Sequence, residues 1–464
     1  MTGCPFASRR GFLAGGLAGG LAAGLAGVAR AAPQGDVPRD APPADAAAKG
    51  ITAASQGPGR QESVPFRGAR QAGILTPLQS HTYFAAFDLT TTRQAEVAAL
   101  LARWTLAAEH MARGEAAQPD SPAPAPDPGA DPAIPPRPRP AGDSGEAFGL
   151  APARLSVTFG FGAGLFVRDG QDRYGLASRR PEALVDLPRF NGDQMQEART
   201  GGDLSVQACA DDPQVAFHAV RQLARIAGGV AVLRWVQSGF SANFAANDTP
   251  RNLMGFKDGT QNPLSRRPEE SVGGAVRPAT KDAVWVGEDG PAWMRGGSYL
   301  VVRRIRVALE HWDATDTEFQ EQVMGRHKVS GAPLGGTSEF DPLDLDAVDA
   351  DGNSVIPDTA HVRLAAAASN GGADMLRRGY SYNDGVNMVA ERWPPWRQGL
   401  EYDSGLLFIC YQRDPRAGFI PVFEQMSRLD MLNQYVTHTG GGLFACPGGA
   451  REGGFVGQGL FEAA

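Results

Sequence analysis

Asp258 lies in the stretch NLMGFKDGTQNP (residues 252–263), where a carboxylate stands among glycines, an amide and a closing proline. Asp-Gly is a common turn pair, because glycine adopts positive φ and the carboxylate can accept a backbone hydrogen bond. Taken locally, the pattern favours a turn. A carboxylate held in a pocket can also accept and return a proton, so both interpretations of Asp258 stay open at this point.

Other candidate groups follow about a hundred residues later. His361 lies in DTAHVRLAAAASNGG (358–372) after the strand-like SVIP (354–357), and Arg377 and Arg378 lie in MLRRGYSY (375–382). Taken singly, a histidine is usually a satisfied core or surface residue, and arginines are usually solvated. An imidazole can also bind a metal ion, and a guanidinium can stabilise developing negative charge without losing its proton. Together with Asp258, these residues form a candidate catalytic set.

Several other chemistries lack their usual motifs. The chain has no G-x-x-x-x-G-K-[ST], H-E-x-x-H, G-x-S-x-G or EF-hand spacing, and GFGAGLF (160–166) lacks a dinucleotide-binding context. The four cysteines form no C-x-x-C or C-x-x-C-H motif, and Cys209 and Cys410 lie in apolar strand patterns typical of buried thiols. A formal charge of -7 argues against nucleic-acid binding.

The amino terminus has the layout of an export signal. SRRGFLAGGLAGGLAAGLAGVARAA begins with Arg9 and Arg10 and continues as a weakly apolar run, so residues 1–31 resemble a twin-arginine signal peptide. The alternative, an uncleaved membrane anchor, is disfavoured by the many glycines. We expect a periplasmic or otherwise exported protein without stable membrane insertion after cleavage. Twin-arginine export carries folded proteins, often with a cofactor already inserted.

The first half of the body reads as an antiparallel α+β unit. Residues 32–66 are a flexible leader, and a first domain is expected over 67–245, with a proline-rich surface loop at 116–143. Periodicity predicts strands at 81–89, 154–166, 203–210 and 230–240, and helices at 91–115 and 212–228. The first helix has an expected apolar stripe of Val97, Leu100, Leu101, Trp104 and Leu106.

A second half repeats this pattern weakly. A connecting segment at 246–295 carries GFKDGT, and a second domain is expected over 296–460. The pattern predicts strands at 297–309 and 405–413 and helices at 316–326 and 421–436. The two related halves predict an α+β fold with antiparallel sheets.

Six motifs, in order, carry a family resemblance over roughly residues 80–449: FGFGAGLF, GDLSVQACADDP, NLMGFKDGTQNP, GRHKVSGAPLGG, AHVRLA and RRGYSY. Together they resemble the haem-containing dye-decolorising peroxidases, in particular the exported branch called deferrochelatase/peroxidase. The resemblance implies two ferredoxin-like domains whose sheets form a barrel-like core, as in the dimeric α+β barrel superfamily. It also implies one haem b (iron protoporphyrin IX) per chain, in the C-terminal half.

The resemblance also implies residue roles. His361 matches the proximal ligand of the haem iron, and Asp258 and Arg377 match the distal acid–base pair, with Arg378 as the alternative to Arg377. A carboxylate on the other His361 nitrogen would increase its donation to iron; Asp430 is the candidate and Glu424 the rival. Cofactor contacts are also expected from Gly259, Thr260 and Phe408. Leu406, Leu407 and Phe408 either line the distal pocket or form a core strand.

The implied activity is oxidation of dyes, phenolics or similar reductants by hydrogen peroxide, with an acidic pH optimum because the base is a carboxylate. Alternatives are a deferrochelatase that releases iron from haem, with ferrous-iron oxidation as a variant, and a non-catalytic haem carrier. Iron-uptake components are possible partners, and a homo-oligomer is possible. Bulky reductants would deliver electrons through surface aromatics, for which the candidates are Trp235, Trp285, Trp312, Trp393, Tyr380 and Tyr382.

Overall fold

The computed structural model describes residues 62–118, 142–242, 249–262, 281–390 and 398–462, all within one compact unit, Ser55–Ala464. The predicted signal peptide and most of the leader therefore lie outside the described residues. The strands are β1 (His81–Leu89), β2 (Ser156–Gly162), β3 (Leu204–Ala210), β4 (Ala231–Phe240), β5 (Ser298–Val307), β6 (Leu376–Arg377), β7 (Tyr380–Ala390), β8 (Gln398–Gln412) and β9 (Val436–Cys446).

The helices complete the element list. They are α1 (Gln94–Ala112), α2 (Pro213–Ile226), α3 (Lys281–Val284), α4 (Leu309–Asp313), α5 (Thr317–Met324), α6 (His361–Ala365), α7 (Phe419–Leu429) and α8 (Gln458–Phe461). Short 3-10 helices include η4 (Glu197–Arg199), η7 (Ala367–Asn370) and η8 (Met431–Gln434). Among the described residues, none of these helices has both the length and the apolar character needed to cross a membrane.

The strands close into a ring. The order is β5-β9-β2-β3-β1-β4-β7-β8, and β8 pairs back with β5, while the two-residue β6 pairs with β8. Every pairing between these strands is antiparallel. The expected α+β barrel-like core is therefore confirmed.

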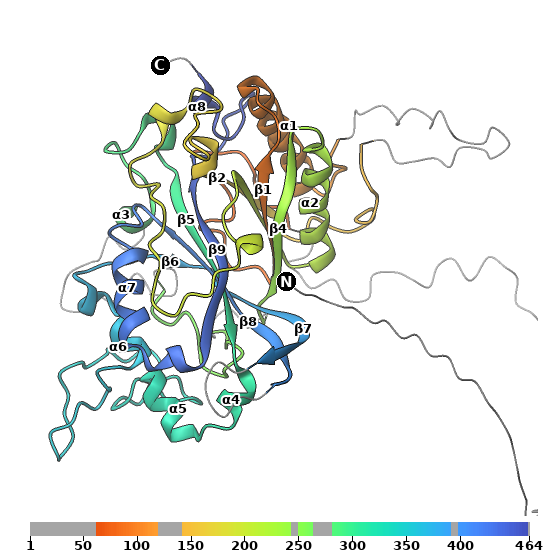
Figure 1. Cartoon of the computed structure of the whole chain (residues 1–464). Helices are drawn as coiled ribbons and strands as arrows, with labels where there is room; N and C mark the ends of the chain where they lie inside the picture. Colours follow the sequence, from red (N-terminus) through yellow and green to blue (C-terminus); the bar gives the residue numbers. More distant parts are fainter. Residues whose placement is uncertain (1–61, 119–141, 243–248, 263–280, 391–397, 463–464) are drawn as a thin grey trace, which may run out of the picture. The chain divides into compact units, whose positions relative to one another are not determined.

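The ring consists of two ferredoxin-like halves. In the first half the order is β2-β3-β1-β4, and in the second it is β7-β8-β5-β9, which is the same order when each half is numbered from its own first strand. The halves meet through short pairings, Phe240 with Ser381 and Phe161 with Ala445. In Figure 1, α1 and α2 lie together beside β1 and β4, whereas α6 and α7 lie near each other in the second half.

Helix α2 begins where the sequence predicts. Asp212 caps it by accepting hydrogen bonds from the backbone of Gln214 (2.8 Å) and Val215 (3.3 Å), and Pro213 occupies the first turn. Trp104 of α1 is fully buried and donates its indole N–H to Leu223 O at 2.8 Å. This bond joins α1 to α2, and Trp104 also packs against Phe87 of β1 and Phe159 of β2, which holds α1 on the sheet.

The predicted apolar stripe of α1 is wrong at one position, Leu106. Leu106 is 52% exposed, whereas Ala107 and Ala108 are buried. The helical period places positions 97, 100, 101, 104, 107 and 108 on one face, so residue 106 points away from the sheet.

The second half departs from prediction at three places. The predicted helix 421–436 ends at Leu429, because Asp430 has extended backbone and its carboxylate caps η8 by accepting from Leu432 N at 2.8 Å. SVIP is not a strand: only Ser354 forms an isolated bridge, with Val348. Strands β7 and β9 had no counterpart in the prediction.

Candidate active site

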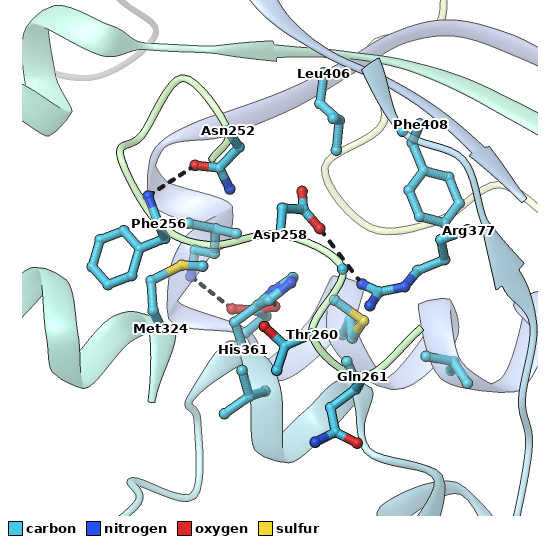
Figure 2. A pocket seen from close by; sticks show the side chains of 18 of the residues that line it. Asn252, Phe256, Asp258, Thr260, Gln261, Met324, His361, Arg377, Leu406 and Phe408 are labelled. Carbon is cyan, nitrogen blue, oxygen red and sulfur yellow. Dashed lines mark hydrogen bonds and ion pairs between the residues drawn. The ribbon is translucent and has the colours of Figure 1, made fainter. Parts of the chain in front are cut away.

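A cavity of about 900 Å³ lies in the second half of the fold (Figure 2). It is lined by the segment 249–262 and by residues of β5, α6, β6, β8 and α7. Its volume is in the range of cofactor sites. Apolar walls include Met254, Ile305, Val307, Leu406, Phe408, Val422, Phe423, Met426 and Leu432.

Asp258 both belongs to a turn and lines this cavity. Gly255 and Gly259 have φ of 85° and 112°, values that favour glycine, and Asp258 N donates to Pro250 O at 2.7 Å. Asn252 closes the preceding turn by accepting from the backbone of Met254 (3.1 Å) and Phe256 (3.3 Å; Figure 2). The two interpretations of the motif are therefore compatible, since the turn presents the carboxylate to the cavity.

Arg377 also lines the cavity, with its guanidinium Nη1 3.9 Å from Asp258 Oδ1 (Figure 2). Both side chains keep about a third of their surface exposed, 32% for Arg377 and 35% for Asp258. The distance between Asp258 and Arg377 is also constrained by Asn262. The side-chain amide of Asn262 donates to Arg377 O (2.7 Å) and accepts from Arg377 N (3.2 Å). Asn262 thereby ties the Asp258 segment to β6.

Arg378 makes different contacts from its neighbour. It is only 2% exposed, its Nη2 donates to Gln79 Oε1 at 2.8 Å, and its Nη1 donates to Thr76 O. Arg378 thus ties the second half to residues that precede β1. Successive side chains of an extended backbone point to opposite sides, so the side chains of Arg377 and Arg378 have different surroundings.

His361 is the first residue of α6 and lines the same cavity. Its Nδ1 lies 2.7 Å from Asp430 Oδ2, which leaves Nε2 as the ring nitrogen able to bind a metal ion. Glu424, by contrast, pairs with Arg428 at 3.0 Å on the surface of α7. Burial alone would lower the pKa of His361, but the charge and hydrogen bond of Asp430 outweigh burial, and the pKa is raised.

The other predicted contact residues also line the cavity: Gly259, Thr260 and Phe408. The residues 406–408 of β8 were expected either to line the pocket or to form a core strand, and each expectation holds for part of this stretch. Leu406 and Phe408 line the cavity, whereas Leu407 is fully buried in the core with Tyr380 and Ile409.

Sequence reasoning missed Arg326, which also lines the cavity. Its Nη1 donates to Gly331 O (2.6 Å) and Glu339 O (2.9 Å), whereas its buried Nη2 has no hydrogen-bond partner in the described residues. Burial lowers the pKa of Arg326. A buried cation with an unused donor fits an anionic group on a ligand. The residue lies within GRHKVSGAPLGG, a motif that contributes to the family resemblance but gives no local signal for the role of its arginine.

A second missed group spans the two halves. Arg303 of β5 donates to His438 Nδ1 at 3.2 Å and forms an ion pair with Asp193, which belongs to the first half. Arg303 and His438 both line the cavity. Burial, followed by the Arg303 charge, holds the pKa of His438 well below its usual range, so this imidazole is neutral near pH 7.

The surface-aromatic hypothesis fails for the described candidates. Trp235, Trp285, Trp312, Tyr380 and Tyr382 are all buried, and Trp393 lies outside the described residues. Aromatic residues that pack in cores and barrels bury most of their area, so residue type alone was a poor guide to exposure. Tyr402 of β8, which is 50% exposed, was not among the candidates.

Comparison with known proteins agrees with this fold. The family model described as Dyp-type peroxidase, N-terminal, matches residues 71–241, and the model described as Dyp-type peroxidase, C-terminal, matches residues 249–451. The chain therefore belongs to the Dyp-type peroxidase family and is a haem-dependent oxidoreductase.

Individual relatives cover nearly the whole chain. It is 38% identical to the dye-decolorizing peroxidase of Thermobifida fusca, over 98% of this chain and 97% of the relative. It is 37% identical to the deferrochelatase of Escherichia coli K12, over 84% of this chain and 85% of the relative. The solved structure of ferric DtpA from Streptomyces lividans is similar with a TM-score of 0.73 and 39% identity, covering 88% of this chain and 100% of that one.

Proposed function

We propose that this protein is a haem b peroxidase that uses hydrogen peroxide to oxidise dyes, phenolics or similar reductants. In this proposal His361 is the proximal ligand, and Asp258 and Arg377 are the distal acid–base pair. The observation that carries the proposal is that one cavity is lined both by the Asp258–Arg377 pair, 3.9 Å apart, and by His361 with Asp430 2.7 Å from its Nδ1.

The cavity fits the chemistry of haem. The macrocycle is apolar and suits the aliphatic and aromatic walls, whereas its propionates are anionic and suit the unused Nη2 of Arg326. The His361 Nε2 would hold the iron, because Nδ1 is occupied by Asp430. Gly259, Thr260 and Phe408 would line the rest of the cofactor site.

When bound, haem supplies the iron that activates peroxide and takes up the oxidising equivalents. Asp258 would accept the proton from the inner peroxide oxygen and return it to the outer oxygen, which leaves as water. Arg377 would stabilise the negative charge that develops while the O–O bond breaks, because a guanidinium keeps its proton throughout. Asp430 would hold the His361 ring in one tautomer.

Absorption spectra of the purified holoprotein test this proposal. We expect peroxide to change the haem spectrum within seconds, and a phenolic donor such as guaiacol to restore the initial spectrum while its coloured product accumulates. A haem spectrum that peroxide leaves unchanged would support the carrier alternative.

A second candidate is iron release from haem, favoured by the similarity to the Escherichia coli deferrochelatase. It would use the same cavity. Extraction of the porphyrin after incubation with a reductant and an iron chelator tests for iron release: iron-free protoporphyrin indicates deferrochelatase activity, whereas intact haem counts against it.

We also propose twin-arginine export to the periplasm, on the basis of the Arg9–Arg10 signal in residues 1–31. A homo-oligomer and iron-uptake partners remain predictions. Fractionation of cells that express the full chain or an Arg9→Lys/Arg10→Lys variant tests the export route.

A further inference from the structure

The segment that carries Asp258 is held by a buried carboxylate outside the motif. We infer that Glu339 is a positioning residue that sets where Asp258 lies, and hence how fast peroxide reacts. This inference rests on the proposed role of Asp258 as the proton carrier. It assigns a role to a residue that neither the motif nor the cavity lining contains.

Glu339 contacts residues on either side of Asp258. Its Oε1 accepts from Thr260 Oγ1 at 2.9 Å, and its Oε2 lies 2.5 Å from Lys257 Nζ. A hydrogen bond from Thr249 also acts on the same carboxyl. These partners all belong to the segment 249–262, so one side chain fixes this segment at its start and on both sides of Asp258.

The carboxylate is buried and ionised. Glu339 is only 8% exposed. Burial alone would raise the pKa of its carboxyl, but hydrogen bonds from Lys257, Thr249 and Thr260 outweigh burial, and the pKa is lowered. Charge-assisted hydrogen bonds of this kind are stronger than neutral ones.

Glu339 is itself held in place. Its backbone carbonyl accepts from Arg326 Nη1 at 2.9 Å. The neighbouring Gly331 has φ of 76°, and a Cβ there would lie 2.8 Å from Lys257 Cδ and 3.3 Å from Glu339 Cγ. The close packing at Gly331 therefore lets the Lys257–Glu339 pair form. One arginine that lines the cavity thus connects to the Asp258 segment through Glu339.

The position of Asp258 depends on such contacts because its own carboxylate lies 3.9 Å from Arg377, beyond hydrogen-bond distance. A displacement of about 1 Å in a reacting group can lower a rate about 100-fold. Loss of the Glu339 charge should therefore slow the reaction with peroxide without removal of any group that contacts peroxide or the cofactor.

The test compares Glu339→Gln with Glu318→Gln, a matched change at an exposed glutamate of α5. Stopped-flow absorption of the holoproteins should show a peroxide reaction about 10- to 100-fold slower for Glu339→Gln and unchanged for Glu318→Gln. In haem-free protein, hydrogen exchange of the backbone amides in 249–262 should rise about 10-fold for Glu339→Gln only. Thr260→Val removes one contact to Glu339 and should raise the same exchange by a smaller factor. Because exchange is measured in haem-free protein, this result does not depend on the place of Thr260 in the cofactor site, and it serves as the test where Glu339→Gln does not fold.

A double mutant shows whether Glu339 acts through Asp258. In an Asp258→Asn background, the added Glu339→Gln change should slow the reaction less than 2-fold, because the group that it positions is already lost. A full additional loss, or unchanged exchange in 249–262, would overturn the inference. Failure of the proposed function gives a different result, in which Asp258→Asn alone leaves the rate unchanged.

Discussion

Asp430 Oδ2 lies 2.7 Å from His361 Nδ1, although the two residues are 69 positions apart in the chain. The other oxygen of Asp430 accepts from Leu432 N at 2.8 Å, where α7 ends and η8 begins. The carboxylate is therefore fixed by a backbone donor as well as by the imidazole. The end of α7 is thus an element that orients the proposed haem ligand.

Replacement of Asp430 tests that orientation. We expect Asp430→Asn to weaken haem retention about 10- to 100-fold, the range measured for partners of metal-bound histidines, and to shift the haem absorption bands. The matched control is Glu424→Gln, which removes an exposed carboxylate of α7 that pairs with Arg428. Haem titration of the haem-free proteins measures both. Equal affinities for Asp430→Asn and the control would exclude a role for Asp430.

Substitutions of the adjacent residues Arg377 and Arg378 should have different effects. Arg377→Leu should retain haem and fold but react with peroxide about 100-fold more slowly or worse, because the developing charge loses its partner. Arg378→Met should instead lower the free energy of unfolding by about 2–4 kcal/mol, since the half-buried carbonyl of Thr76 and the buried side chain of Gln79 lose their donor. Urea titration and stopped-flow absorption separate the two effects. A reversed pattern would mean that Arg378 is the distal residue.

Acid should remove a stabilising interaction near the proline-rich segment. Burial alone would raise the pKa of Glu146, but hydrogen bonds from Ser144 and the backbone and the charge of His218 lower it to about 2. Because the folded-state pKa is below the ordinary 4.5, the stabilisation is complete above about pH 4.5 and is lost as pH falls towards 2.

Melting temperatures test this dependence. Glu146→Gln should melt below the wild type at pH 6, and the difference should shrink as pH falls to 3. Glu452→Gln, at an exposed glutamate, is the control and should differ little at either pH. A Glu146→Gln difference that stays constant with pH would contradict the assignment.

Much of the first half was predictable because its elements follow simple periods. The strand at 81–89 and the Asp-Pro start of α2 were confirmed. Strand β9 was missed because its central GGG reads as a loop. Gly441 has φ of 146°, and a Cβ there would lie 2.1 Å from Val302 O, so the approach of β5 explains the glycine. The need for glycine at position 441 thus comes from Val302, which is 139 positions away in the chain, and the local sequence pattern does not show it.

Only the site residues that belong to recognisable sequence motifs could be predicted. Asp258, His361 and Arg377 line one cavity, and they were named from ordered motifs. Arg326 and Glu339 were not, because their significance comes from burial and from contacts with distant residues. The buried tryptophans and tyrosines illustrate the same limit, since exposure is a property of the fold and not of residue type.

Dye turnover should be fastest at acidic pH. A carboxylate remains a competent base at a pH where an imidazole would be protonated. The pH profile of kcat/KM for peroxide, measured with a dye whose own charge does not change over the range, tests this. An optimum clearly above pH 7 would count against Asp258 as the base.

The most direct test of the account is the rate at which Asp258→Asn holoprotein reacts with peroxide in stopped-flow absorption. Asparagine keeps the size of the side chain but cannot accept the proton. We expect haem content and melting temperature close to those of the wild type, with a rate about 100- to 10,000-fold lower. A variant that folds, binds haem and reacts at the wild-type rate would contradict the proposed role of Asp258.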